Sequence, residues 1–192
     1  MIHPLQKLNN QIKEEAETIL TDYGVLDILK SHGVPHVSGS YDLNLMTWRD
    51  LDIYLAVEDI SKENFFHMGL QMDAVLNPIK MSFRNELIGK TKGLPYGLYW
   101  GIYLGNERDG AWKIDIWAIN KIECERLIAL AKAIKEKLNS TNSLQILHIK
   151  SKCWQDPEYR RSYGSADIYK AVLENNIETI EEFFDYKNNR FL

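Results

Sequence analysis

Two aspartates, Asp50 and Asp52, stand at alternate positions of an otherwise apolar run, Asp-Leu-Asp-Ile-Tyr-Leu-Ala-Val. Successive side chains of a β-strand point to opposite faces, so a strand over 50–57 would place both carboxylates on one face. Two like charges held this close repel each other unless a cation lies between them. Carboxylate oxygens, with water and substrate phosphates, are the ligands that Mg²⁺ prefers. The spacing therefore predicts a divalent-metal site.

A glycine and a serine, Gly39 and Ser40, precede this pair of aspartates, and a spacer of nine residues (41–49) separates them from Asp50. Glycine lets the backbone come close to a phosphate, and a hydroxyl beside exposed N–H groups can bind one. We expect the spacer to begin as a helical turn whose N-terminus points back at Gly39 and Ser40. The stretch 39–52 thus predicts a combined site for phosphate and metal.

The pattern of an apolar residue, Gly-Ser, a spacer and Asp-x-Asp resembles the signature of the nucleotidyltransferase superfamily. The resemblance implies a third carboxylate on a later strand, for which Asp115 in Lys-Ile-Asp-Ile-Trp is the candidate. Many members carry a further glycine and a basic residue in the spacer. Here the glycine is missing, and Arg49 takes the place of the basic residue as a candidate for nucleotide binding.

The resemblance also implies roles for these residues. Asp50 and Asp52 would ligate two Mg²⁺ ions, and Asp115 would complete the acceptor-side ion and help to deprotonate the incoming hydroxyl. Gly39 and Ser40 would bind the terminal phosphates of a nucleoside triphosphate. The implied reaction is the transfer of a nucleoside monophosphate to an acceptor hydroxyl, with release of pyrophosphate.

The elements that must position these residues alternate between helical and strand patterns. Apolar spacing predicts helices over 4–20 and 25–31, and a helix that begins after Ser61 and ends at Asn77. Strands are expected over 36–38, 50–57 and 79–83, and over 96–104 and 112–119, which a polar turn joins into a hairpin. This hairpin would bring Asp115 into the sheet, on the face that it shares with Lys113 and Trp117.

These patterns predict an α/β (α+β) fold, in which helices flank a mixed sheet of nucleotidyltransferase type. We expect a catalytic core with N-terminal helices over 1–120 and a helical C-terminal region over 121–192. The basic residues Lys150, Lys152, Arg160 and Arg161 fall in that region. We interpret them as a solvated basic face, while the resemblance leaves open a role in binding the triphosphate.

Composition limits the partners of the protein. A net charge of −4 argues against general binding of duplex nucleic acid. No apolar run approaches the ~18 residues that cross a bilayer, and no signal pattern opens the chain, so a cytoplasmic protein without a membrane partner is expected. Cys124 and Cys153 lie far apart, which favours reduced structural thiols over a zinc site.

The acceptor stays open at this point. Small antibiotic-modifying members of the resembled family use a hydroxyl of an aminoglycoside or a lincosamide, and an acidic protein would suit a cationic drug. One alternative is a nucleotidyltransferase-fold interaction or regulatory module, as in toxin–antitoxin pairs, with a protein partner and weak or no transferase activity. Another is a non-enzymatic interaction domain in which the acids are surface residues.

Overall fold

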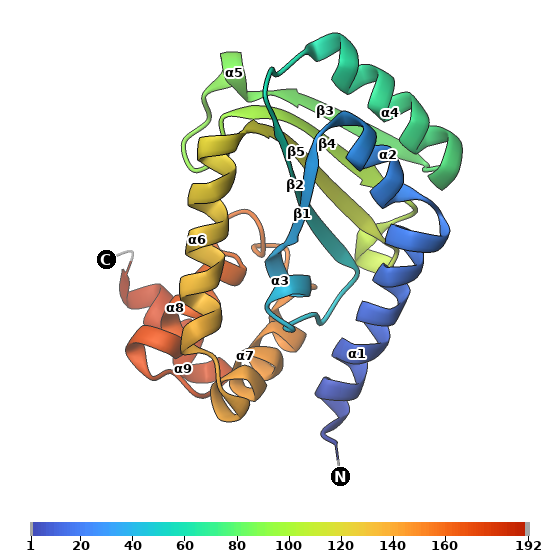
Figure 1. Ribbon diagram of the computed structural model, residues 1–192. Coiled ribbons are helices and arrows are strands. Elements are labelled where there is room, and N and C mark those ends of the chain that lie inside the picture. Colours follow the sequence, from blue (N-terminus) through green and yellow to red (C-terminus); the bar gives the residue numbers. More distant parts are fainter. Residues whose placement is uncertain (1, 191–192) are drawn as a thin grey trace.

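A five-stranded mixed sheet forms the centre of the computed structural model, which describes residues 2–190 (Figure 1). Its strand order is β1-β2-β5-β4-β3, with β2 and β5 parallel and the other neighbours antiparallel. The strands are β1 (Val34–Ser38), β2 (Asp50–Val57), β3 (Lys80–Asn85), β4 (Gly97–Tyr103) and β5 (Lys113–Asn120). The predicted mixed sheet and the hairpin of β4 and β5 are confirmed.

One face of the sheet is apolar because buried apolar residues alternate with partly exposed ones along most of β2 and β5. Leu51, Ile53 and Leu55 of β2 are buried, whereas Asp50 and Asp52 lie on the other face. Four helical segments pack against this apolar face and share one hydrophobic core with it (Figure 1). They are α1 (Pro4–Glu17), the π-helical turn η1 (Thr18–Asp22), α2 (Val25–His32) and α4 (Lys62–Leu76).

Side-chain caps explain where two predicted helices begin. Ser61 accepts a hydrogen bond from the backbone N–H of Asn64 at the start of α4, and Asn120 accepts one from Glu123 after β5. Asn77 ends α4 in the left-handed conformation. The first helix extends two residues beyond the predicted 4–20 range, because the π-helical turn continues it to Asp22. Two short helices, α3 (Gly39–Asp42) and α5 (Glu86–Gly89), complete this part of the chain.

The C-terminal part of the chain is helical, as predicted, and lies on the other side of the sheet (Figure 1). Its helices are α6 (Lys121–Lys137), α7 (Ser140–Cys153), α8 (Ser165–Asn175) and α9 (Ile180–Arg190). A second hydrophobic cluster joins α7, α8 and α9 to Leu43, Leu45 and Trp48 of the spacer. The spacer therefore connects the polar face of the sheet to the helical region, and a division after residue 120 stays a prediction.

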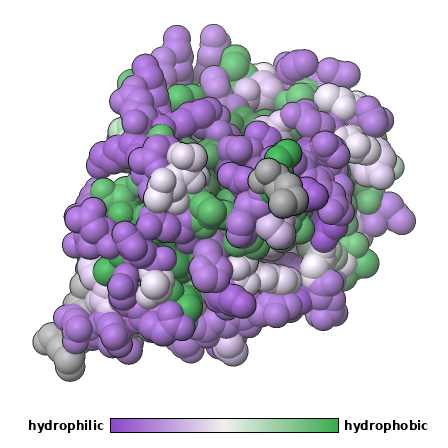
Figure 2. Space-filling model, turned by 90° about the horizontal axis from the view of Figure 1, so that it is seen from below, coloured by the Kyte–Doolittle hydropathy of each residue, from purple (hydrophilic) through white to green (hydrophobic). Residues whose placement is uncertain are grey.

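The surface is mainly hydrophilic on the side seen from below, where apolar side chains lie scattered among polar ones (Figure 2). Across residues 2–190, none of the helices has the combination of length and apolarity that a bilayer span requires.

Candidate active site

The three predicted aspartates lie on one face of two neighbouring strands. Asp52 of β2 is the register partner of Asp115 in the parallel strand β5, and Asp50 is the partner of Lys113. The neighbour of Asp52 on its other side is Ser38, the last residue of β1. The predicted polar face of β5 is therefore confirmed, and it brings the carboxylates of Asp52 and Asp115 to adjacent strands.

The turn at Gly39 covers this group of acids. Gly39 has a φ of 62°, and a Cβ atom added there would overlap Oδ2 of Asp52. Only glycine tolerates both this left-handed backbone and the close approach. The helix α3 begins at the same residue, two positions earlier than the turn expected at the start of the spacer, and so includes Gly39 and Ser40. The backbone of Gly39 thus lies directly against the Asp52 carboxylate.

Asp52 is the acid that the protein itself neutralises least. Burial raises its pKa to about 7, and the negative charges of Asp50 and Asp115 raise it further. Among residues 2–190, its side chain has no hydrogen-bond or ion-pair partner. A carboxylate in this environment gains free energy by keeping its proton or by binding a cation.

Asp115 has partners on both oxygens. Its Oδ1 accepts a hydrogen bond of 2.7 Å from the Tyr99 hydroxyl, and its Oδ2 lies 2.6 Å from Lys113 Nζ. Gly101 lacks a side chain where the Tyr99 hydroxyl reaches over it, which opens the way to Asp115. Burial and the charge of Asp50 nevertheless raise the pKa of Asp115, because these effects outweigh its two partners. Burial alone would lower the pKa of Lys113, but the negative charges of Asp115 and Asp50 outweigh this effect and raise it above its ordinary value.

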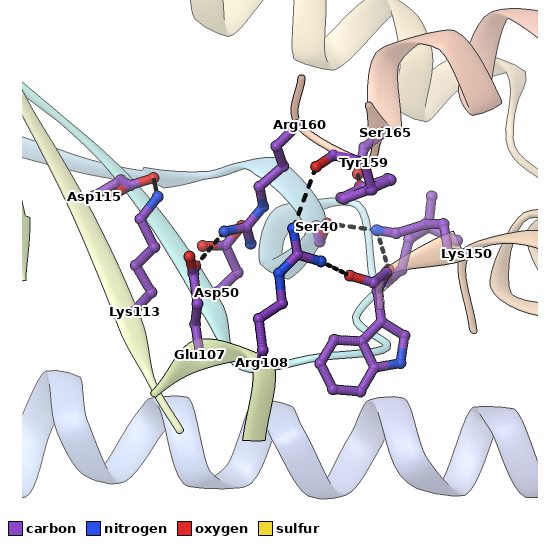
Figure 3. A network of polar contacts seen from close by, with 12 residues as sticks. Ser40, Asp50, Glu107, Arg108, Lys113, Asp115, Lys150, Tyr159, Arg160 and Ser165 are labelled. Atoms are coloured by element: carbon purple, nitrogen blue, oxygen red, sulfur yellow. Dashed lines mark hydrogen bonds and ion pairs between the residues drawn. The ribbon is translucent and has the colours of Figure 1, made fainter. Parts of the chain in front are cut away.

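Arg160 brings a second cation to the site from the loop between α7 and α8 (Figure 3). Its Nη2 lies 2.9 Å from Asp50 Oδ2, and its Nη1 lies 2.5 Å from Glu107 Oε2. The other oxygen of Asp50, Oδ1, is buried and has no hydrogen-bond partner in the described part of the chain.

A buried lysine fixes Ser40. Lys150 of α7 is fully buried, and its Nζ donates to Ser40 Oγ at 2.6 Å, to the Leu45 carbonyl at 2.7 Å and to the Tyr169 hydroxyl at 3.2 Å (Figure 3). The same ammonium lies 4.7 Å from the centroid of a ring of Trp48. Ser40 is thereby bound to the helical region as well as to the sheet.

The interpretation of the basic residues as a solvated face is wrong for the buried Lys150 and correct for the exposed Lys152 and Arg161. Arg160 keeps some exposure, but its guanidinium is paired with Asp50 and Glu107, which the interpretation missed. One signal in the sequence could have identified Lys150. It falls on the apolar face of α7 at helical spacing from Ile146 and Cys153, which are buried. No comparable pattern surrounds Arg160, which lies in a loop.

Arg49 is paired with the first helix. Its Nε and Nη2 donate to the two carboxylate oxygens of Glu15 at 2.5 and 2.7 Å, and its Nη1 donates to the Gly110 carbonyl at 3.3 Å. These contacts tie α1 to the hairpin of β4 and β5. Its predicted role in nucleotide binding stays a prediction.

The described side chains include no group of three or more Asp, Glu, His or Cys residues that, as they stand, could hold a metal ion. Lys113 and Arg160 take one oxygen each of Asp115 and Asp50. The oxygens without a partner are those of Asp52 and Oδ1 of Asp50. They are hard ligands of the type that Mg²⁺ prefers, and their chemistry fits that ion.

Comparison with known proteins identifies the fold. No family model and no curated protein matches the sequence. The fold is similar to that of a cytoplasmic RNA terminal U-transferase, with 13% identity and a TM-score of 0.55 over 89% of this chain and 51% of the other. It is also similar to the Cid1 poly(U) polymerase. A mutant of that enzyme bound to MgATP gives 14% identity and a TM-score of 0.57 over 89% of this chain and 52% of the other. The MgGTP complex of the same polymerase gives 14% identity and a TM-score of 0.56 over 85% of this chain and 50% of the other. The chain spans about half the length of these structures.

Proposed function

We propose that this chain, which has the fold of the nucleotidyltransferase superfamily, transfers a nucleoside monophosphate from a nucleoside triphosphate to an acceptor hydroxyl. The observation that carries the proposal is the unneutralised carboxylate of Asp52. It lies between Asp50 and Asp115 and under the Gly39 turn, where only glycine fits. A group of acids that served stability alone would not place an unpaired carboxylate beside two others.

Asp50, Asp52 and Asp115 are the residues that would hold Mg²⁺ in this proposal. When bound, the metal would stabilise the negative charge on the phosphates and on the departing pyrophosphate. The free oxygens of Asp50 and Asp52 are already directed to the polar face of β2, so they need no change of strand geometry to act as ligands.

Asp115 is the proposed general base. In the reaction, the acceptor oxygen forms a bond to the α-phosphorus, the bond from that phosphorus to the α,β-bridging oxygen breaks, and pyrophosphate leaves. The proton of the hydroxyl passes to Asp115. Burial and the negative charge of Asp50 raise the pKa of Asp115 in the metal-free protein. Asp115 is proposed as the base because it is a carboxylate beside the other two acids of the site.

Ser40 is the proposed phosphate ligand, with the backbone of Gly39 beside it. Because an ammonium group only donates, Lys150 uses the oxygen of Ser40 and leaves its O–H free to donate elsewhere. Tyr169 can likewise direct its own O–H at Ser40. Both contacts hold the hydroxyl in one position, where it can donate to a phosphate oxygen.

The acceptor is proposed by analogy. The names of the similar structures include an RNA terminal U-transferase, so the terminal hydroxyl of a single-stranded RNA is the first acceptor to test. An aminoglycoside or lincosamide hydroxyl is the second. A cytoplasmic location belongs to the same proposal.

The test is a titration of the purified protein with each of the four nucleoside triphosphates, with and without Mg²⁺. We expect metal-dependent binding that is lost in Asp50→Ala and Asp52→Ala and retained in Asp59→Ala, which removes an exposed acid of the same type. Release of pyrophosphate is then measured with RNA oligonucleotides and with aminoglycosides. Binding that both site variants leave unchanged would contradict the proposal and favour an interaction module.

A further inference from the structure

Arg160 links two segments that lie far apart in the sequence. Its guanidinium bridges Asp50 at the start of β2 and Glu107 in the turn between β4 and β5. The side chain is 29% exposed, and its carbon Cζ lies 5.9 Å from the centroid of a ring of Trp48. Burial alone would lower the pKa of Arg160, but the negative charges of Asp50 and Glu107 raise it, so the guanidinium stays a cation.

Arg108, which follows Glu107 in the turn between β4 and β5, fixes the loop that carries Arg160. Its guanidinium donates to the carbonyl oxygens of Trp154, Asp156 and Tyr159, at 2.6, 3.3 and 3.4 Å (Figure 3). Arg160 itself has a φ of 68°, a left-handed conformation that few residues other than glycine adopt. The turn of the hairpin thus holds the loop in a shape that directs Arg160 at Asp50.

The contact between Arg160 and Asp50 satisfies only half of the carboxylate. Arginine and carboxylate commonly pair through two parallel hydrogen bonds. Here only Nη2 of Arg160 contacts Asp50, because Nη1 contacts Glu107. Oδ1 of Asp50 stays buried without a partner in the described part of the chain. A divalent cation could therefore replace Arg160 at Asp50 and also use the free oxygen.

We propose that Arg160 is a resident counter-ion of Asp50, which a divalent cation displaces and which then binds a phosphate oxygen of the incoming nucleotide. This inference rests on the proposed function. Guanidinium groups bind carboxylates and phosphates through the same fork of donors, so the exchange keeps Arg160 paired. A metal ion that binds alone leaves Arg160 with Glu107 only. Metal and nucleotide must then bind with positive coupling, each strengthening the other by the same factor.

The coupling is measured with Mn²⁺, whose free concentration is read from its electron paramagnetic resonance signal. Titrations are made with and without the non-hydrolysable α,β-methylene analogues of ATP and UTP. For the wild-type protein we expect the better analogue to tighten Mn²⁺ binding at least about 5-fold, within the usual range of about 5- to 150-fold for coupled ligands.

The variant Arg160→Gln separates the inference from the proposed function. We expect it to bind Mn²⁺ alone about 5-fold more tightly than the wild type, and to lose most of the coupling to the analogue. Glu107→Gln removes one anchor of Arg160 and is expected to weaken the analogue's effect less than Arg160→Gln does. Arg161→Gln removes an exposed neighbouring arginine and should behave as the wild type.

The outcomes distinguish a failure of the inference about Arg160 from a failure of the proposed function. If Mn²⁺ and the analogue bind, but Arg160→Gln and Glu107→Gln match the wild type, the inference is wrong and the proposed function stands. If Arg160→Gln fails to fold, as judged by circular dichroism, Glu107→Gln alone decides by the same comparison. If no protein in the series binds Mn²⁺ even with the analogues, the proposed function fails and the inference fails with it.

Discussion

Replacement of Asp52 by asparagine should stabilise the metal-free protein above neutral pH, although it removes a residue of the proposed site. Burial, with the charges of Asp50 and Asp115, raises the pKa of Asp52 from the ordinary value of 3.8 to about 7. The difference of about three units corresponds to about 4 kcal/mol between the charged and the protonated side chain in the folded protein. Asparagine has a similar shape and carries no charge.

The sign of the pH dependence follows from proton binding. The folded protein keeps the Asp52 proton to a higher pH than the unfolded chain does, so stability falls as the pH rises from about 4 to about 7. Above that range the wild type has lost the full free energy of about 4 kcal/mol that the Asp52 proton contributes at low pH. The buried amide costs about 1–3 kcal/mol where it lacks partners. The net gain of Asp52→Asn is then about 2 kcal/mol at pH 8.5, or about 4–8 °C in Tm for a chain of this size.

The assay is thermal unfolding, followed by circular dichroism in the presence of EDTA, at pH 8.5 and at pH 5. At pH 5 the wild type has lost less than half of that free energy, so the two proteins should unfold within a few degrees of each other. Asp59→Asn at an exposed acid is the control and should change little at either pH. If Asp52→Asn unfolds below the wild type at pH 8.5, or if its effect is the same at both pH values, Asp52 is not a strained carboxylate.

Two further substitutions test Gly39, which lies against Asp52, and Lys150, which binds Ser40. Gly39→Ala adds a methyl group that overlaps the Asp52 carboxylate, and we expect a loss of about 1–3 kcal/mol in urea unfolding together with weaker nucleotide binding. Gly24→Ala, also at positive φ but with open space around it, should lose less and leave binding unchanged. Lys150→Met leaves three acceptors without their donor and should cost about 2–3 kcal/mol and reduce nucleotide affinity. The exposed Lys152→Met should change the stability by less than about 0.5 kcal/mol, and equal effects of the two lysine variants would contradict the structural role of Lys150.

The sheet and its polar face were predictable because strands alternate with a period of two. Every second residue is buried from Leu51 to Leu55 and from Ile114 to Ala118, so the faces of Asp52 and Asp115 follow from the sequence once the strands are recognised. The pairing of these two strands was not readable from alternation. The resemblance predicted only that Asp115 lies in the same sheet, and the structure adds that its strand is the parallel neighbour of β2, with Asp52 opposite Asp115.

Long charged side chains were predicted least well, because their environment depends on segments that are distant in the sequence. Arg160 pairs with Asp50, and Arg49 pairs with Glu15, and neither partner can be inferred from local spacing. Lys150 is different, since its place on an apolar helix face indicated burial. Local patterns therefore located the acids of the site and placed Lys113 on their face, but they did not locate Arg160.

The balance of charges at the site is the basis for our proposal that it binds a cation. Asp50, Asp52, Asp115 and Glu107 meet there, and the protein supplies only Lys113 and Arg160 against them. When all four carboxylates are ionised, the two cations leave a net charge of −2, which one divalent cation would balance. Below pH 7 a proton on Asp52 removes part of this excess, but at higher pH the buried charge destabilises the fold. Asparagine at position 52 would relieve that cost. In the proposed function a divalent cation would relieve it instead, because it would supply positive charge and its preferred ligands are carboxylate oxygens such as those of Asp52.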